Sequence, residues 1–136
     1  MSHFDVNWLA VLLATVASMA LGMGWYMGLA NQWIKATGKA RDDLMGSGGS
    51  AVPFAFAAVC QLIMAYFIAM LTEALIGETT IAGAVIIGVH MWFGFILTSM
   101  VLNHRYQNMS WNLTLIDGGY LLGVVVVQGL VIGVFG

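Results

Sequence analysis

The sequence predicts an all-α fold: an integral membrane bundle of four transmembrane helices with short connections. Of the 136 residues, 61% are hydrophobic and 7% are charged, and the mean hydropathy is +0.94. A soluble domain carries about 25% charged residues, so this chain has too few to cover a surface in water. Four stretches are apolar and long enough to cross the roughly 30 Å hydrocarbon core of a bilayer as helices. The alternation of polar and apolar residues that marks transmembrane β-strands does not occur.

The predicted spans follow one another closely and form one domain. They cover residues 8–29, 52–76, 81–102 and 113–135. The segment before the first span lacks the positive residues of a signal peptide, so we interpret this span as retained. Pro53 falls in the first turn of the second span, where a missing N–H does no harm. The tight turn "IGETT" separates the second span from the third, and neighbouring helices are expected to be antiparallel.

Positive residues predict the orientation of the bundle. Lys35, Lys39 and Arg41 lie in the first connection, residues 30–51, and Arg105 lies in the third. Because short loops rich in Lys and Arg stay in the cytoplasm, we expect both connections there and both termini on the outer side. The expected location is a bacterial inner membrane, with the lipid bilayer as the main partner.

The stretch "LGMGWYMGLANQWIK" predicts a membrane exit. A phosphate-binding G-x-G-x-x-G needs a strand before it, whereas these glycines end a long apolar run. Gly24 and Gly28 instead form a small-xxx-small pair, which allows helices to approach closely. The fourth span has two such pairs: Gly119 with Gly123, and Gly129 with Gly133. These ridges are expected to serve either the bundle or a subunit contact, and we expect a homo-oligomer.

The chain resembles a known family in three segments: "LGMGWYMGLANQW", "GVHMWFGFILTSMVLN" and "LIDGGYLLG". They are similar to those of the bacterial membrane family called domain of unknown function 1761, over most of the chain and in the same order. The resemblance implies an integral membrane protein with four short spans. It supplies no activity and no functional residue.

His90 is predicted to be the ionisable residue that lies deepest in the membrane. It lies about 10 residues inside the third span, or roughly 15 Å from its outer end. An ionisable residue at such depth is a functional hypothesis by default. Gly94 and Thr98 continue a small, mildly polar stripe on the same helix face. Three interpretations stay open: a neutral histidine hydrogen-bonded inside the bundle, a proton or ligand site, or a metal ligand.

The fourth span contributes a second group of candidates. Asp117 lies one turn inside the span, with Tyr120 three residues on and Gln128 eleven residues on, close to the same helix face. His104 and Arg105 are plausible partners of this carboxylate. Asp117 is expected to form a structural ion pair or a cytoplasmic entry site.

Gln61 in the second span and Ser18 in the first extend this polar set. They are expected either to line a narrow polar seam or to form hydrogen bonds between helices.

Several functional classes are excluded or disfavoured. A net charge of -2 and the lack of a basic stripe argue against nucleic-acid binding. No clustered ligand motif predicts a metal site, and no cofactor is expected, because His90 has no second histidine at its depth for a haem. A pairing of His90 with Met19 or Met64 is geometrically possible. One cysteine and one deep histidine are poor material for catalysis, so we do not expect an enzyme.

Three functions therefore stay open, of which the last and least favoured is a membrane enzyme or lipid-binding protein that uses the aromatic cytoplasmic edge. The first is a small oligomeric channel or transporter for an ion or small solute, using His90, Asp117 and the other polar residues. The second is an interaction protein that assembles through its glycine-rich helix faces. Four thin helices leave little volume for a private pore, so transport is expected to need an oligomer.

Overall fold

The computed structural model describes residues 6–39 and 52–136, and the regular elements in these two segments are helices without strands. Four helices are long and apolar enough to cross a membrane. They are α1 (Trp8–Gly28), α4 (Val52–Ile76), the continuous helix Ile81–Tyr106, and α7 (Trp111–Phe135). The predicted all-α class with four membrane-spanning helices is confirmed.

The third long helix has three parts: α5 (Ile81–Met91), the π-helix η1 (Trp92–Leu97) and α6 (Thr98–Tyr106). A π-helical turn is wider than an α-helical one and is often found at functional sites. The Trp92 side chain is directed inward and donates a hydrogen bond of 2.9 Å from Nε1 to the Gly118 carbonyl of α7.

Local sequence determines where these helices begin and end. Asn7, Thr80 and Ser110 each accept a hydrogen bond from a backbone N–H in the first turn of the helix that follows. Such side-chain caps satisfy donors that a helix N-terminus leaves unpaired. The turn after α4 contains Gly77 at φ 91°, a left-handed conformation that glycine adopts without a Cβ clash.

The first connection contains a helix that the sequence analysis did not predict. Helix α2 (Ala30–Thr37) follows α1 after Leu29 and ends at Gly38, with φ 73°. Residues 40–51 of this connection lie outside the described residues. The third long helix also ends four residues later than predicted, at Tyr106, and α7 begins two residues earlier, at Trp111.

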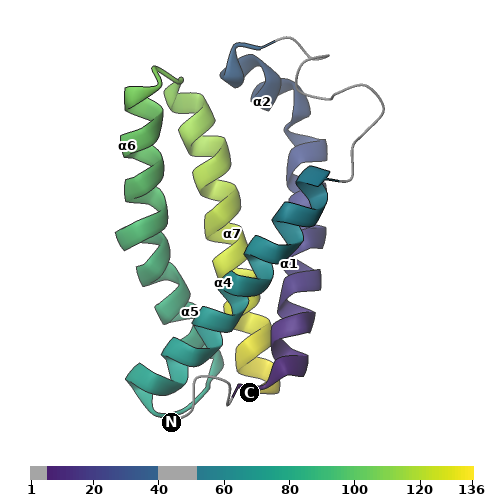
Figure 1. The fold of residues 1–136 in the computed structure, drawn as a ribbon, viewed down its shortest axis with the longest axis vertical. Coiled ribbons are helices and arrows are strands. Elements are labelled where there is room, and N and C mark those ends of the chain that lie inside the picture. Colours follow the sequence, from purple (N-terminus) through teal and green to yellow (C-terminus); the bar gives the residue numbers. More distant parts are fainter. Residues whose placement is uncertain (1–5, 40–51) are drawn as a thin grey trace.

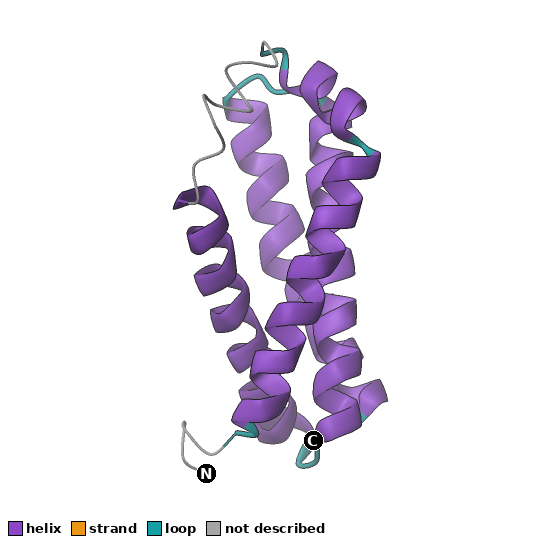
Figure 2. Ribbon diagram, turned by 90° about the vertical axis from the view of Figure 1, so that its right-hand side faces the viewer, coloured by secondary structure: helices purple, strands orange, loops and turns teal. Residues whose placement is uncertain are grey.

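Helix α7 lies at the centre of the bundle. It packs against α1, α4 and α5, and near its start also against α2. Figure 1 shows α7 between α1 on one side and the α5–α6 helix on the other, with α4 crossing in front. In the view of Figure 2 the loops gather at the two ends of a bundle whose helices run along its long axis. One helix thus connects all the others.

The two ends of the bundle differ in charge. At one end, Ser110 donates a hydrogen bond of 2.7 Å to the Ala36 carbonyl and so ties α2 to the start of α7. We call this the basic end, because it carries Lys35 and Arg105. At the opposite end, the Asn7 amide donates a hydrogen bond of 2.7 Å to the Phe135 carbonyl. The described start of the chain and its last residues therefore lie on the same side, as an even number of spans requires.

The interior is narrow and built from small residues. Its hydrophobic core consists of Val11, Ala14, Ala65, Ile68, Ala69, Ala84, Val125 and Ile132. Larger apolar side chains face outward; Val16, Phe56 and Phe95 are each exposed by about two thirds (67%, 68% and 67%). Outward apolar side chains on helices of this length are suited to contact with lipid hydrocarbon.

Candidate functional site

A buried hydrogen-bonded cluster joins three helices in the middle of the bundle. The Ser18 hydroxyl of α1 donates to Oε1 of Gln61 on α4, at 2.6 Å. The amide nitrogen of Gln128 on α7 donates to the Ser18 hydroxyl at 3.1 Å and to the Gln61 carbonyl at 2.9 Å. All three side chains are buried, with at most 4% exposed. The Gln128 Oε1 is buried without a hydrogen-bond partner in the described segments.

Tyr120 extends this cluster toward the basic end. The amide nitrogen of Gln61 donates a hydrogen bond to the Tyr120 hydroxyl. Helix α1 leaves room for that hydroxyl because residue 22 is glycine: a Cβ there would lie 2.9 Å from the Tyr120 oxygen. Ser18 and Gly22 are spaced by four, so they lie on the same face of α1. This face is directed at α7.

Asp117 is hydrogen-bonded to tyrosine and not to the arginine expected from the sequence. The Tyr26 hydroxyl donates to Asp117 Oδ1 at 2.5 Å. The rings of Tyr26 and Tyr120 meet edge to face, with centroids 5.0 Å apart. The polar cluster therefore reaches from Gln128 to Asp117, with the Tyr26–Tyr120 ring contact as its one step without a hydrogen bond.

Arg105 and His104 have other partners at the basic end. Nη2 of Arg105 donates to the Met109 carbonyl and to the Thr114 hydroxyl, both at 3.0 Å, and the guanidinium stacks 3.6 Å from the Trp111 ring centroid. His104 shares a hydrogen bond of 2.7 Å with the same hydroxyl. Arg105 therefore donates within the α6–α7 connection instead of pairing with Asp117. Arg105 thus closes the α6–α7 connection.

A pocket of about 310 Å³ lies beside the polar cluster, between α1 and α4. It is bordered by Tyr26, Gln61 and Tyr120 and by apolar side chains that include Met19, Met23 and Phe54. The tyrosine ring contact divides the cluster into a part with Tyr26 and a part with Tyr120 and Gln61, and the pocket borders both parts. A small molecule there would contact hydroxyl and amide groups on one side and methionine side chains on the other.

A known protein family matches most of the chain. The family described as "Protein of unknown function (DUF1761)" matches residues 9–133. The chain belongs to this family. No curated protein and no solved structure matches it. The family match confirms the resemblance seen in the sequence and includes every residue of the polar cluster.

His90 and Thr98 lie apart from the cluster in this member of the family. Both are exposed, on the outward face of the third long helix. The His90 Nδ1 lies 2.8 Å from the Ile86 carbonyl, and the Thr98 hydroxyl donates to the Gly94 carbonyl at 2.8 Å, so both bonds stay within one helix. An added Cβ at Gly94 would meet no atom within 4 Å. Within residues 6–39 and 52–136, the His90 ring therefore has no hydrogen bond to another helix of the bundle.

The predicted glycine pairs differ in what they contact. A Cβ at Gly129 would lie 2.9 Å from the Val85 backbone nitrogen, and one at Gly133 would overlap the Ile81 backbone, so this pair lets α7 pack directly on α5. Gly119 and Gly123 lie against the Trp25 and Leu21 side chains of α1. A Cβ at Gly24 or Gly28 would meet nothing within 4 Å, which places this pair outside the bundle contacts of the described chain.

Tyr26 is a residue of the polar cluster that the sequence analysis did not single out. Its hydroxyl is the partner of Asp117. The spacing by four of Ser18, Gly22 and Tyr26 is the signal that could have placed it on the α7-facing side. Among the described residues, no group of three His, Cys, Asp or Glu side chains is placed to hold a metal ion.

Proposed function

We propose that this protein is a subunit of a small channel or transporter in a bacterial inner membrane. Its cargo would be a proton or a small solute that donates hydrogen bonds. The observation that carries the proposal is the polar cluster, which runs from Asp117, one turn inside α7, to Gln128 near the middle of the bundle. Following the distribution of Lys and Arg, the basic end faces the cytoplasm.

The polar groups of the cluster are suited to bind a cargo that donates hydrogen bonds. A carboxylate at the Asp117 end attracts a cation or proton, and the pocket beside Tyr26 and Tyr120 gives access to the next polar groups. At the other end, Gln128 Oε1 is a buried acceptor to which no described residue donates. Buried polar atoms are nearly always paired, so an unpaired one calls for an explanation. A passing donor would satisfy it.

Passage through the rest of the membrane requires a conformational change or a neighbouring subunit. Beyond Gln128 the interior is closed by apolar side chains, among them Val11 and Ile132, each no more than 1% exposed. Thr15 and Thr72 donate to carbonyls of their own helices and do not continue the cluster. The polar route therefore serves one half of the bilayer, as expected for a gated path.

Flux through vesicles tests the proposal. Purified protein is reconstituted with an internal pH dye, and proton entry is measured after a pH step; a parallel arm follows labelled methylammonium. Asp117→Asn and Gln128→Leu are expected to lower the faster of the two fluxes about tenfold, equal to a barrier rise of about 1.4 kcal/mol. His90→Ala, outside the cluster, is expected to leave flux unchanged. Wild-type flux no greater than that of empty vesicles, in both arms, would refute transport.

The second candidate function, assembly as an interaction protein, is favoured by the outward position of His90. A polar ring at this depth, facing hydrocarbon, is costly, and its Nε2 has no partner in the described residues. Gly94 next to it lets a second helix approach closely. We expect a second copy of the chain to cover this face.

Cysteine crosslinking tests that assembly. In a Cys60→Ala background, Gly94→Cys is expected to form disulfide-linked dimers in native membranes, because this face would meet its copy. Val16→Cys, on the lipid-facing side of α1 at 67% exposure, is the matched control and should stay monomeric. Adding His90→Leu is expected to weaken crosslinking at position 94. Equal crosslinking at positions 94 and 16 would contradict a specific interface.

A further inference from the structure

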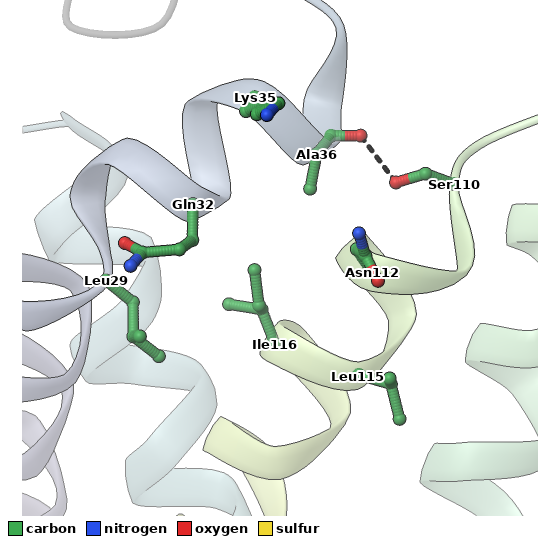
Figure 3. A pocket seen from close by; sticks show the side chains of 8 residues that line it. All are labelled: Leu29, Gln32, Lys35, Ala36, Ser110, Asn112, Leu115 and Ile116. Atoms are coloured by element: carbon green, nitrogen blue, oxygen red, sulfur yellow. Dashed lines mark hydrogen bonds between the residues drawn. The ribbon is translucent and has the colours of Figure 1, made fainter.

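A second and larger pocket lies at the basic end, away from the polar cluster. Its volume is about 560 Å³, and it separates α2 from the first turns of α7. Figure 3 shows Gln32 and Asn112 on opposite sides of this pocket, with Lys35 above them and Ile116 between and below them. The hydrogen bond from Ser110 to the Ala36 carbonyl, 2.7 Å long, holds its two walls together.

The electrostatics of this pocket favour an anion. Lys35 is exposed, and none of the described residues that line the pocket carries a carboxylate. Asp117, the nearest acidic residue along α7, is turned to Tyr26, which donates to it at 2.5 Å. The positive end of the α7 dipole adds to the charge of Lys35. The side-chain amides of Gln32 and Asn112 supply neutral N–H donors at the same level.

The polarity of the pocket changes with depth. Lys35, Ser110 and Asn112 lie toward the basic end, whereas Leu115 and Ile116 lie further along α7, in the direction of the bundle centre. Leu29, at the end of α1, completes the apolar part. Tryptophan rings gather at membrane–water interfaces, and Trp33 and Trp111 flank this level of the bundle. The pocket therefore has a cationic, hydrogen-bonding mouth and an apolar floor at interfacial depth.

We infer that this pocket binds an anionic phospholipid, with its phosphate at Lys35 and Asn112 and the start of an acyl chain against Leu29, Leu115 and Ile116. A soluble phosphate would use the polar mouth alone and leave the apolar floor uncovered. A zwitterionic lipid would bring a cation close to Lys35. The chemistry that fits both halves of the pocket is a net negative head group joined to hydrocarbon.

Native mass spectrometry of the purified chain in detergent tests this inference, with phosphatidylglycerol and phosphatidylcholine as probes. Phosphatidylglycerol is expected to bind more tightly. Lys35→Ala should weaken its binding about fivefold, as expected for one basic residue near an anionic lipid. Lys35→Arg should restore it. Lys39→Ala is the matched control, because Lys39 is a described lysine near the same interface that does not line the pocket.

Two further arms separate a lipid from a free anion. Leu115→Trp fills the apolar floor from a position that is 71% exposed, so the fold should tolerate it. It is expected to weaken binding of the lipid, whereas Leu130→Trp, elsewhere on α7, is not. Excess inorganic phosphate should fail to displace phosphatidylglycerol. The inference is overturned by equal losses for Lys35→Ala and Lys39→Ala, by unchanged binding to Leu115→Trp, or by displacement with phosphate.

Discussion

Replacing Gly133 with alanine is expected to lower the free energy of unfolding by about 3 kcal/mol, at the upper end of the range for overpacked cores. The reason is the direct packing of α7 on α5. The added methyl group would overlap the Ile81 backbone and lie 2.8 Å from the Thr80 carbonyl carbon. Backbone atoms of a packed helix cannot rotate away as a side chain can, so the two helices must separate.

Titration with SDS in mixed micelles, followed by circular dichroism, measures this loss. Gly24→Ala is the matched control, since a Cβ there meets nothing within 4 Å. It should be neutral, whereas Gly129→Ala, at 2.9 Å from the Val85 backbone, should be intermediate. Equal stability of the Gly133→Ala and Gly24→Ala proteins would show that α5 and α7 do not approach as described.

A different variant tests the outward pair Gly24 and Gly28. If Gly24→Leu weakened oligomer formation, this pair would belong to a subunit contact.

Gln61→Leu is expected to cost about 1–2 kcal/mol, the range found for hydrogen bonds between membrane helices. This one side chain accepts from Ser18 and donates to Tyr120, so it joins α4 to both α1 and α7. Leucine has a similar volume but can satisfy neither partner. The Ser18 hydroxyl can then donate its one proton to the Thr15 carbonyl, which lies 3.0 Å away, and this limits the loss.

A double-mutant cycle with Ser18→Ala separates the hydrogen bond from general packing. Because the two side chains share a bond, the loss in the double variant should be smaller than the sum of the single losses. Gln107→Leu, at an exposed position after α6, controls for the change in composition and should leave stability unchanged. Strictly additive losses for Ser18 and Gln61 would mean that their contact contributes no energy.

The polar residues were foreseeable, but their grouping was not. Spacing along α7 places Asp117, Tyr120 and Gln128 close to one face, and the structure brings all three into one cluster with Gln61. The sequence could not show that Tyr26 would take the place of Arg105 beside Asp117. The partner of Asp117 depends on how α1 packs on α7 and on the hydrogen bond that Arg105 donates to the nearby Met109 carbonyl.

The sequence likewise could not show whether the His90 side chain faces the bundle or the outside. Depth is fixed by position along a span, so its place near the middle of the third helix could be predicted. Rotation of the helix about its axis could not, because apolar residues surround α5 on all sides and give no amphipathic signal. The structure turns Ala84 and Gly88 inward and leaves His90 exposed.

The sequence by itself determined that the chain is a helical membrane protein with four spans, because hydrocarbon demands long apolar helices whose backbone groups are paired internally. Tertiary structure alone decided which side of each helix faces its neighbours. In water that side is marked by hydrophobicity, whereas in lipid the outward residues are as apolar as the inward ones. Close packing at Gly129 and Gly133 and the buried bonds of Gln61 and Gln128 make the distinction instead.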